Sequence, residues 1–318
     1  MKIALVIFIT LALAGCALLS LHMGVIPVPW RALLTDWQAG HEHYYVLMEY
    51  RLPRLLLALF VGAALAVAGV LIQGIVRNPL ASPDILGVNH AASLASVGAL
   101  LLMPSLPVMV LPLLAFAGGM AGLILLKMLA KTPQPMKLAL TGVALSACWA
   151  SLTDYLMLSR PQDVNNALLW LTGSLWGRDW SFVKIAIPLM ILFLPLSLSF
   201  CRDLDLLALG DARATTLGVS VPHTRFWALL LAVAMTSTGV AACGPISFIG
   251  LVVPHMMRSI TGGRHRRLLP VSALTGALLL VVADLLARII HPPLELPVGV
   301  LTAIIGAPWF VWLLVRMR

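Results

Sequence analysis

The sequence has 318 residues, of which 61% are hydrophobic and only 10% are charged, and its formal net charge at pH 7 is +9. Soluble globular domains carry about 25% charged residues, so this composition excludes a soluble enzyme or binding module. An excess of Lys and Arg is typical of the cytosolic loops of membrane proteins. The positive charge therefore indicates a membrane protein, and we expect no nucleic-acid partner.

Apolar segments long enough to cross about 30 Å of hydrocarbon follow one another along the whole chain. We predict an all-α polytopic membrane protein with about ten transmembrane helices, formed by one domain over residues 1–318. The segments are residues 3–21, 55–76, 85–103, 106–126, 138–158, 182–200, 226–243, 246–260, 268–290 and 296–315. Ten crossings place both termini on one side, and 14 of the 21 Lys and Arg residues lie there, which indicates that this side is the cytosol.

The first apolar segment allows two interpretations. Leu13-Ala14-Gly15-Cys16 resembles the cleavage box of a bacterial lipoprotein signal, which would make the chain a lipid-anchored assembly factor. The segment stays apolar beyond Cys16, which favours an uncleaved first helix. The loop that follows contains His41 and His43, a spacing that allows metal binding but is more often simply solvated. The four cysteines form no CxxC pair, so we predict no metal site.

Charged residues are few within the apolar segments. Arg51 and Arg54 at the start of the second segment are either interfacial anchors or ligands for acidic groups on a partner. Asp284 and Arg288 are four residues apart, so they can face and neutralise each other on one helix. Asp154 is an ionisable residue that is costly in lipid unless it is paired or hydrated.

Two segments have unusual side chains for a lipid-facing helix. Residues 85–103 contain Asn89, His90, Ser93 and Ser96, so we expect this segment to face protein or water. Residues 138–158 are rich in small residues, which let helices approach closely. These small residues form either a packing face or the lining of a pathway. The loop at residues 159–181 contains Trp170, Trp176 and Trp180, which predicts an aromatic belt at the membrane surface.

The longest polar interruption in the second half is residues 201–225, CRDLDLLALGDARATTLGVSVPHTR. Asp205 is placed to cap a short helix over residues 206–209 that Gly210 ends. Asp211 is placed to cap a second helix over residues 212–217 that Gly218 ends. Two short helices hinged at a glycine suit insertion into a groove on another protein. The alternative is an ordinary solvated loop between two membrane helices.

Several catalytic devices are missing from the sequence. There is no Gly-x-x-x-x-Gly-Lys-Ser/Thr phosphate loop, no His-Glu-x-x-His and no Gly-x-Ser-x-Gly. We therefore predict that the chain is not an enzyme but a conduit powered by another protein. An ion-coupled secondary transporter that works alone is the rival hypothesis.

Five segments together resemble a known family. They are RLPR (residues 51–54), LIQGIVRNPLASPDILGV (71–88), LALGDARATTLGV (207–219), GPISFIGLVVPH (244–255) and ELPVGVLTAIIGAPWFVWLL (295–314). In this order they resemble the permease subunits of type II ABC importers for iron-siderophores and vitamin B12. The similarity is greatest to a permease subunit of the bacterial ferric citrate importers. Another siderophore or cobalamin is the alternative cargo.

This resemblance implies an inner-membrane importer with two permease subunits, expected to form a heterodimer. It also implies two cytosolic ABC ATPase subunits, which use ATP and Mg, and a periplasmic substrate-binding protein. The chain itself would bind no cofactor.

The resemblance also assigns roles to residues of this chain. Those implied to couple to the ATPases are Leu209, Gly210, Asp211, Ala212, Arg213, Leu217 and Gly218. Those implied to dock the binding protein are Arg51, Arg54 and Arg288. Those implied to line the pathway are Thr141, Gly142, Leu145, Ser146 and Trp149.

Overall fold

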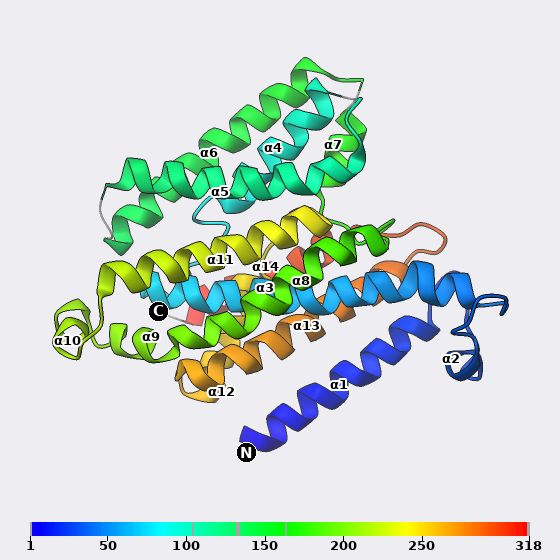
Figure 1. Ribbon diagram of the computed structural model, residues 1–318, viewed down its shortest axis with the longest axis horizontal. Coiled ribbons are helices and arrows are strands. Elements are labelled where there is room, and N and C mark those ends of the chain that lie inside the picture. The colour runs from blue at the N-terminus through cyan, green and yellow to red at the C-terminus, as the bar shows by residue number, and fades with distance from the viewer. Residues whose placement is uncertain (1, 104, 132–133, 163, 317–318) are drawn as a thin grey trace.

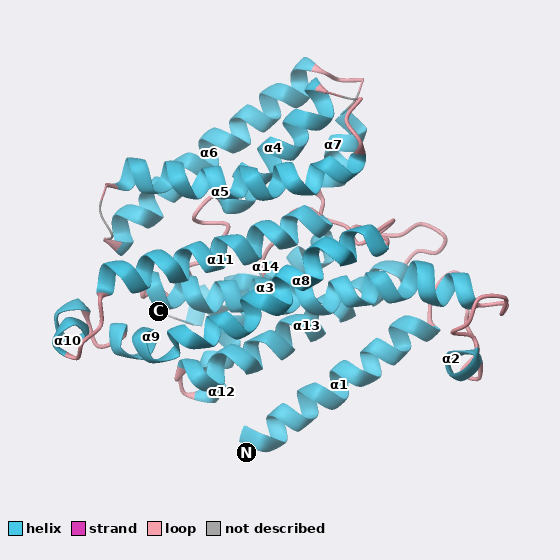
Figure 2. Ribbon diagram, in the orientation of Figure 1, coloured by secondary structure: helices cyan, strands magenta, loops and turns pink. Residues whose placement is uncertain are grey.

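The computed structural model describes residues 2–103, 105–131, 134–162 and 164–316. Over this part of the chain, every regular element is a helix and there are no strands (Figure 2). The predicted all-α membrane fold is therefore confirmed.

Each of the ten predicted segments contains one helix. Seven of the described helices are long and apolar enough to cross a membrane. They are α1 (Lys2–His22), α3 (Leu52–Val76), α5 (Leu111–Ala130), α6 (Pro135–Ser159), α8 (Trp180–Ser197), α11 (Val221–Cys243) and α13 (His265–Ile289). The other three predicted segments form α4 (Val88–Leu102), α12 (Ile249–Thr261) and α14 (Val298–Arg316). At 15 and 13 residues, α4 and α12 are shorter than the roughly 20 residues that a full crossing needs.

Short elements connect these helices. They are α2 (Ala32–Thr35), η1 (Tyr45–Arg51), η2 (Val108–Val110), α7 (Val164–Leu171), η3 (Leu198–Phe200), α9 (Cys201–Leu207) and α10 (Asp211–Thr216). The loop predicted at residues 159–181 thus contains a helix, α7. Its Trp170 is only 7% exposed and packs in a hydrophobic cluster, so it does not belong to a surface belt. Trp176 is exposed, and Trp180 donates a hydrogen bond to the backbone oxygen of Met48.

Helix α3 lies at the centre of the fold, with α8, α11, α12 and α13 packed around it (Figure 1). Glycines allow its backbone to approach two of these neighbours. A side chain at Gly62 would collide with the carbonyl group of Gly276 on α13, and one at Gly69 would collide with Gly250 on α12. Small residues at helix crossings let backbones pack closely where no hydrophobic effect drives association.

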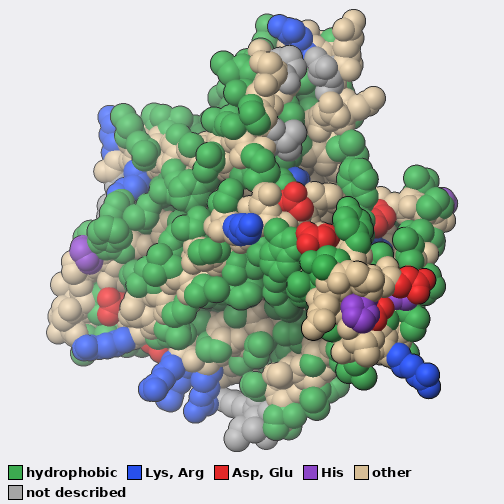
Figure 3. Space-filling view, turned by 45° about the vertical axis from the view of Figure 1, so that its right-hand side comes forward, with side chains coloured by type: hydrophobic (Ala, Val, Ile, Leu, Met, Phe, Trp, Pro, Cys, Tyr) green, Lys and Arg blue, Asp and Glu red, His purple; other side chains and the backbone are tan. Residues whose placement is uncertain are grey.

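Helices α4, α5 and α6 form a second group that packs on α11 (Figure 1). Helix α11 also contacts α3 and α8, so it joins this group to the central one. Helix α3 runs along the long axis of the molecule, from the end that carries α2 to the end that carries α10. Hydrophobic side chains cover most of the face seen in Figure 3, and the charged side chains lie mainly toward its edges, as expected for a chain embedded in lipid.

Candidate functional site

The polar interruption at residues 201–225 begins as a continuation of a membrane helix. Helices α8, η3 and α9 follow one another without a break from Trp180 to Leu207. The prediction of a separate short helix capped by Asp205 is therefore wrong. Asp205 lies inside α9, where its carboxylate accepts hydrogen bonds from the backbone N–H of His265, at 2.9 Å, and from the His265 ring, at 2.6 Å.

The second short helix, α10, is present, but Asp211 does not cap it. The N-cap residue is Gly210, and no side chain bonds to the first turn. Asp211 instead accepts hydrogen bonds from both terminal nitrogens of Arg225, at 3.0 and 2.9 Å. It also forms an ion pair with Arg77, at 3.1 Å. These contacts fix α10 to the end of α3 and to the first turns of α11.

Glycines end both helices, as the sequence predicts. Gly210 and Gly218 have φ angles of +103° and +86°, a region that is costly for residues with a side chain. After Gly218, the N–H of Val219 bonds back to the carbonyl oxygen of Ala214 and closes the helix end. A Cβ at Gly218 would meet no atom within 4 Å, so the need for glycine here comes from backbone conformation and not from crowding.

The α9–α10 segment (residues 201–220) exposes two leucines, which we call the leucine rim, and side-chain contacts hold the segment against α3 and α11. Leu209 is 51% exposed and Leu217 is 49% exposed, whereas Ala214 between them is fully buried. Ala212 and Arg213 are also exposed. The segment is held by the Asp211 contacts and by a 2.7 Å hydrogen bond from Thr224 to Asp203. Exposed leucines on a rigid support are suited to insertion into a groove on another protein.

A cavity of about 880 Å³ opens between α4, α6 and α14. Asn89, His90 and Ser93 line it from α4, as expected from the polarity of this segment. Asp154 lines it from α6 and is exposed there, so of the two alternatives for this carboxylate, paired or hydrated, its exposure favours hydration. Asp84, in the loop before α4, also lines the cavity and accepts a hydrogen bond from the Asn89 amide.

The five residues implied to line the pathway do not line this cavity. They lie on earlier turns of α6, whereas the cavity is bounded by Ala150, Thr153 and Asp154. A side chain at Gly142 would collide with the backbone of Ile85 and Leu86. Ser146 donates hydrogen bonds to the carbonyl oxygens of Gly142 and Asp84, and Leu145 and Trp149 are each 8% exposed. Except for the half-buried Thr141, these residues pack against the loop before α4 within this chain, and their role in lining the pathway stays a prediction.

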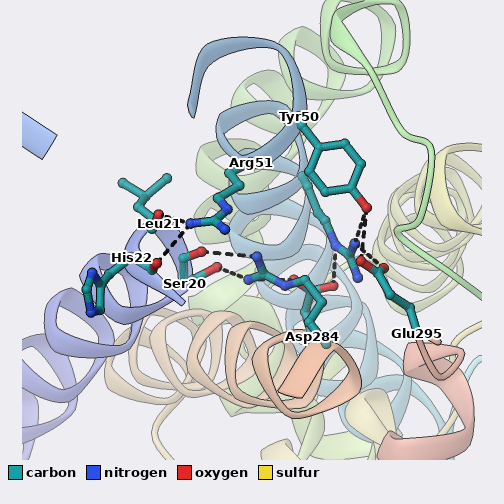
Figure 4. Close-up of polar contacts among 9 residues, drawn as sticks. Ser20, Leu21, His22, Tyr50, Arg51, Asp284 and Glu295 are labelled. Carbon is teal, nitrogen blue, oxygen red and sulfur yellow. Dashed lines mark hydrogen bonds and ion pairs between the residues drawn. The ribbon is translucent and has the colours of Figure 1, made fainter. Parts of the chain in front are cut away.

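At the opposite end of α3 from α10, three arginines form a buried cluster (Figure 4). Arg51, Arg54 and Arg288 are only 2–3% exposed. Arg54 pairs with Asp284 at 2.7 Å and with Glu295 at 2.5 Å. Arg288 pairs with Asp284 at 3.3 Å, which confirms the predicted contact between these two residues on one helix.

The same cluster holds the end of α1. Arg51 donates hydrogen bonds to the carbonyl oxygens of Leu21, at 2.5 Å, and His22, at 3.0 Å, and Arg288 donates to the carbonyl oxygen of Ser20, at 3.1 Å. Figure 4 shows the Arg51 side chain directed toward the end of α1. Docking of a binding protein by the three arginines stays a prediction. A partner's carboxylate would have to displace these internal acceptors to reach them.

Known proteins are similar to this chain along nearly its whole length. The model of the FecCD transport family matches residues 10–316. The chain belongs to the FecCD transport family. It is 43% identical to the Fe(3+)-citrate import system permease protein YfmE of Bacillus subtilis, over 97% of this chain and 94% of the relative. It is 38% identical to the iron(3+)-hydroxamate import system permease protein FhuG of the same organism, over 94% and 92% of the two chains.

A solved metal-chelate type ABC transporter, in an inward-facing conformation, has the same fold. Its TM-score to this chain is 0.87 with 30% sequence identity, and the match covers 99% of this chain and 100% of the solved one. FecCD proteins are membrane permease subunits, and the ATPase activity of their transporters resides in separate subunits. This FecCD chain is therefore a multi-pass membrane permease and is not itself an enzyme.

Some residues of the FecCD permease were missed at the sequence level. Tyr50 and Glu295 complete the arginine cluster, where the Tyr50 hydroxyl donates a 3.0 Å hydrogen bond to Glu295. Glu295 is 245 residues away from Tyr50, so no helical spacing could pair them. Its place at the start of the ELPVG motif was the only available signal.

His41 and His43, in the loop between α2 and η1, lie beside a carboxylate. His43 lies 2.9 Å and His41 lies 3.5 Å from the oxygens of Asp36. Hydrogen bonds from Thr35 and His43 hold the pKa of Asp36 below its ordinary value. Among the described residues, no group of three or more His, Cys, Asp or Glu is placed to hold a metal ion.

Proposed function

We propose that this FecCD permease is one of two permease subunits in an ATP-driven importer that carries ferric citrate from the periplasmic side to the cytoplasm. The observation that carries the proposal is the 43% identity, over nearly the full length, to a ferric citrate permease. Two ABC ATPase subunits, using ATP and Mg, would power it from the cytoplasm. A periplasmic binding protein would deliver the chelate, and both termini of the permease would be cytoplasmic.

The α9–α10 segment supports the ATPase partnership. Its leucine rim is exposed, and its ion pairs connect α10 to both α3 and α11. A push on α10 by a closing ATPase dimer would therefore reach the central helix and the helix that joins the two groups. Of the proposed coupling residues, Asp211 would act through Arg77 and Arg225. Leu209, Ala212, Arg213 and Leu217 would touch the partner, and Gly210 and Gly218 would set the backbone.

Helix α6 supports the second permease subunit. The face opposite its packing residues exposes small side chains, namely Ala144, Ala147, Cys148 and Ser151. Small residues on an exposed membrane helix let a second helix approach closely. The cavity beside the same helix would then lie at the interface between the two subunits, with the partner supplying its other wall.

A neutral ferric hydroxamate is a second candidate cargo. The cavity is lined by the carboxylates of Asp84 and Asp154, and no Lys or Arg is among its described lining residues. Citrate is a tricarboxylate, so its ferric complexes are negatively charged and would be repelled by these groups. A ferric trihydroxamate has no such charge, and the chain is also similar to a hydroxamate permease.

Uptake measurements separate these cargoes. We expect cells that lack their own iron-chelate permeases, and that express this chain with its partner subunits, to take up radioactive ferric citrate. Excess unlabelled ferric citrate should compete, and excess ferric hydroxamate should not. Uptake of ferric hydroxamate but not of ferric citrate would show that the cargo is a hydroxamate. The proposal of an ATP-driven importer would still stand. Uptake that persists without any ATPase partner would instead support the ion-coupled secondary transporter.

The ATPase partnership has a direct test. We expect the double variant Leu209→Asp/Leu217→Asp to lose the ATPase subunit in an affinity pull-down from mild detergent, because carboxylates would replace the leucine rim. The control is Leu34→Asp on α2, which changes a still more exposed leucine (84%) at the other end of the molecule. Mass spectrometry of the wild-type sample would also identify a second permease. Equal recovery of the ATPase with both variants would contradict the assignment.

A further inference from the structure

A pocket with a basic rim lies at the end of the molecule that carries α10. Its volume is about 330 Å³, and it is enclosed by the last turn of α5 and the beginnings of α6 and α11. We call it the basic pocket. Its lining residues are Lys127, Lys131, Leu138, Pro222, Arg225, Phe226 and Leu229.

The basic pocket contains two lysines, Lys127 and Lys131, whose charges no described acidic residue neutralises. Lys127 and Lys131 are four residues apart at the end of α5, a spacing at which like charges repel each other. Both are exposed, and among the described residues neither takes part in an ion pair. The third cation, Arg225, is 4% exposed and is already paired with Asp211. An anion between the two lysines would therefore relieve a repulsion that the fold leaves in place.

The walls of the basic pocket are apolar. Leu138 and Leu229 are buried, and Lys127 Nζ lies 3.6 Å from the centre of the Phe226 ring. Beside the pocket, α5 exposes Ile124 (59%) and Met128 (66%). The pocket is thus cationic at the helix ends and continues into hydrophobic surface along the helices.

Trp227, in the first turns of α11, extends this exposed hydrophobic surface. Tryptophan is enriched where membrane helices leave the hydrocarbon. Basic pockets between transmembrane helices at the cytoplasmic side bind anionic lipid headgroups. We propose that the basic pocket binds the phosphate headgroup of an anionic phospholipid, whose acyl chains lie along the exposed face of α5.

The site has a consequence for the neighbouring α10. A headgroup phosphate between Lys127 and Lys131 lies next to Arg225, the residue that holds Asp211. The lipid therefore supports the same side chain that positions the α9–α10 segment. This inference rests on the orientation given in the proposed function, which places this end of the molecule in the cytoplasm, and not on the identity of the cargo.

The test is a lipid titration of the full-length chain, purified in uncharged detergent with its partner subunits. Bound lipid is measured by native mass spectrometry. We expect saturable binding of short-chain phosphatidylglycerol and no binding of the matched phosphatidylcholine. The variant Lys127→Gln/Lys131→Gln should bind phosphatidylglycerol about 30-fold more weakly, since each basic residue near an anionic headgroup contributes about 1 kcal/mol.

Two further variants keep the result interpretable. Arg264→Gln/Arg267→Gln removes the same charge from exposed residues at the start of α13, outside the basic pocket, and should bind the lipid like the wild type. Lys127→Arg/Lys131→Arg keeps the charge and should retain binding. Retained binding by this variant shows that the loss in the glutamine variant follows the charge.

Three outcomes would overturn the proposal. Equal weakening by the lysine and arginine pairs would mean that only overall surface charge matters. Displacement of the lipid by an equal concentration of inorganic phosphate would identify a site for free anions. Binding only after the partner subunits are removed would mean that a partner, and not a lipid, covers the basic pocket.

Discussion

Replacing Arg54 with methionine is expected to destabilise the permease by about 3–5 kcal/mol, the usual cost of removing one member of a buried ion pair. Methionine approximates the length of the arginine side chain but leaves Asp284 and Glu295 without their shared guanidinium group. Both carboxylates are poorly exposed, at 1% and 11% of their side-chain surface. The expected result is a clearly lower midpoint of thermal unfolding for the detergent-purified chain.

A matched arginine provides the control for this experiment. Arg31 precedes α2, is exposed, and forms no ion pair with a described residue, so Arg31→Met should unfold like the wild type. Adding Glu295→Gln to the Arg54→Met variant should recover part of the loss, because one uncompensated buried charge is removed. A variant Arg54→Met that melts at the wild-type temperature would show that the cluster does not stabilise the fold.

Replacing Gly210 with valine is expected to lower the transport-coupled ATPase activity of the assembled importer about tenfold, because its backbone conformation (φ +103°, ψ 154°) costs a residue with a side chain roughly 1–3 kcal/mol. The φ angle of Gly210 is +103°, and a Cβ there would meet only Arg77, at 4.0 Å. The variant would therefore shift the turn before α10 without disturbing the membrane helices. Membrane insertion and thermal unfolding should remain as in the wild type.

Gly40 offers the same strain at a site without a role in coupling. Its φ angle is +102°, nothing lies within 4 Å of its Cβ position, and it is in the loop between α2 and η1. The variant Gly40→Val should therefore keep its coupled ATPase activity. Coupled activity that is normal in Gly210→Val, or equally reduced in both variants, would argue against a special role for the turn before α10.

The membrane helices could be predicted from the sequence because their signal is local. A run of about 20 apolar residues has few alternatives to a helix once it lies in lipid, and the ten predicted segments each contain one. A glycine that ends a helix is a local signal as well, so the helix ends at Gly210 and Gly218 could be predicted from the sequence. Helix α7 was missed because its eight residues are too short to stand out in an apolar chain.

The roles of the acidic residues could not be predicted in the same way. In the sequence, Asp205 and Asp211 precede residues expected to form helical turns, which makes them plausible caps. In the structure, Asp205 instead bonds to His265, and Asp211 pairs with Arg225 and Arg77. The partner of Asp205 is 60 residues away, and that of Arg54 on α13 is 230 residues away. Such pairs depend on which helices become neighbours, and hydrophobic periodicity does not specify this.

The central position of α3 constrains how the protein can be made. In the finished fold, 83% of its most apolar window is buried, largely by α11, α12 and α13. These helices are synthesised at least 140 residues later, so during translation α3 enters the bilayer before most of its neighbours exist. The mean hydropathy of its most apolar window is 2.8, which is high enough for α3 to be stable in lipid by itself. Such a helix can remain in the bilayer until later helices associate with it. Polar substitutions on α3 would therefore harm biogenesis even where the completed fold could satisfy them.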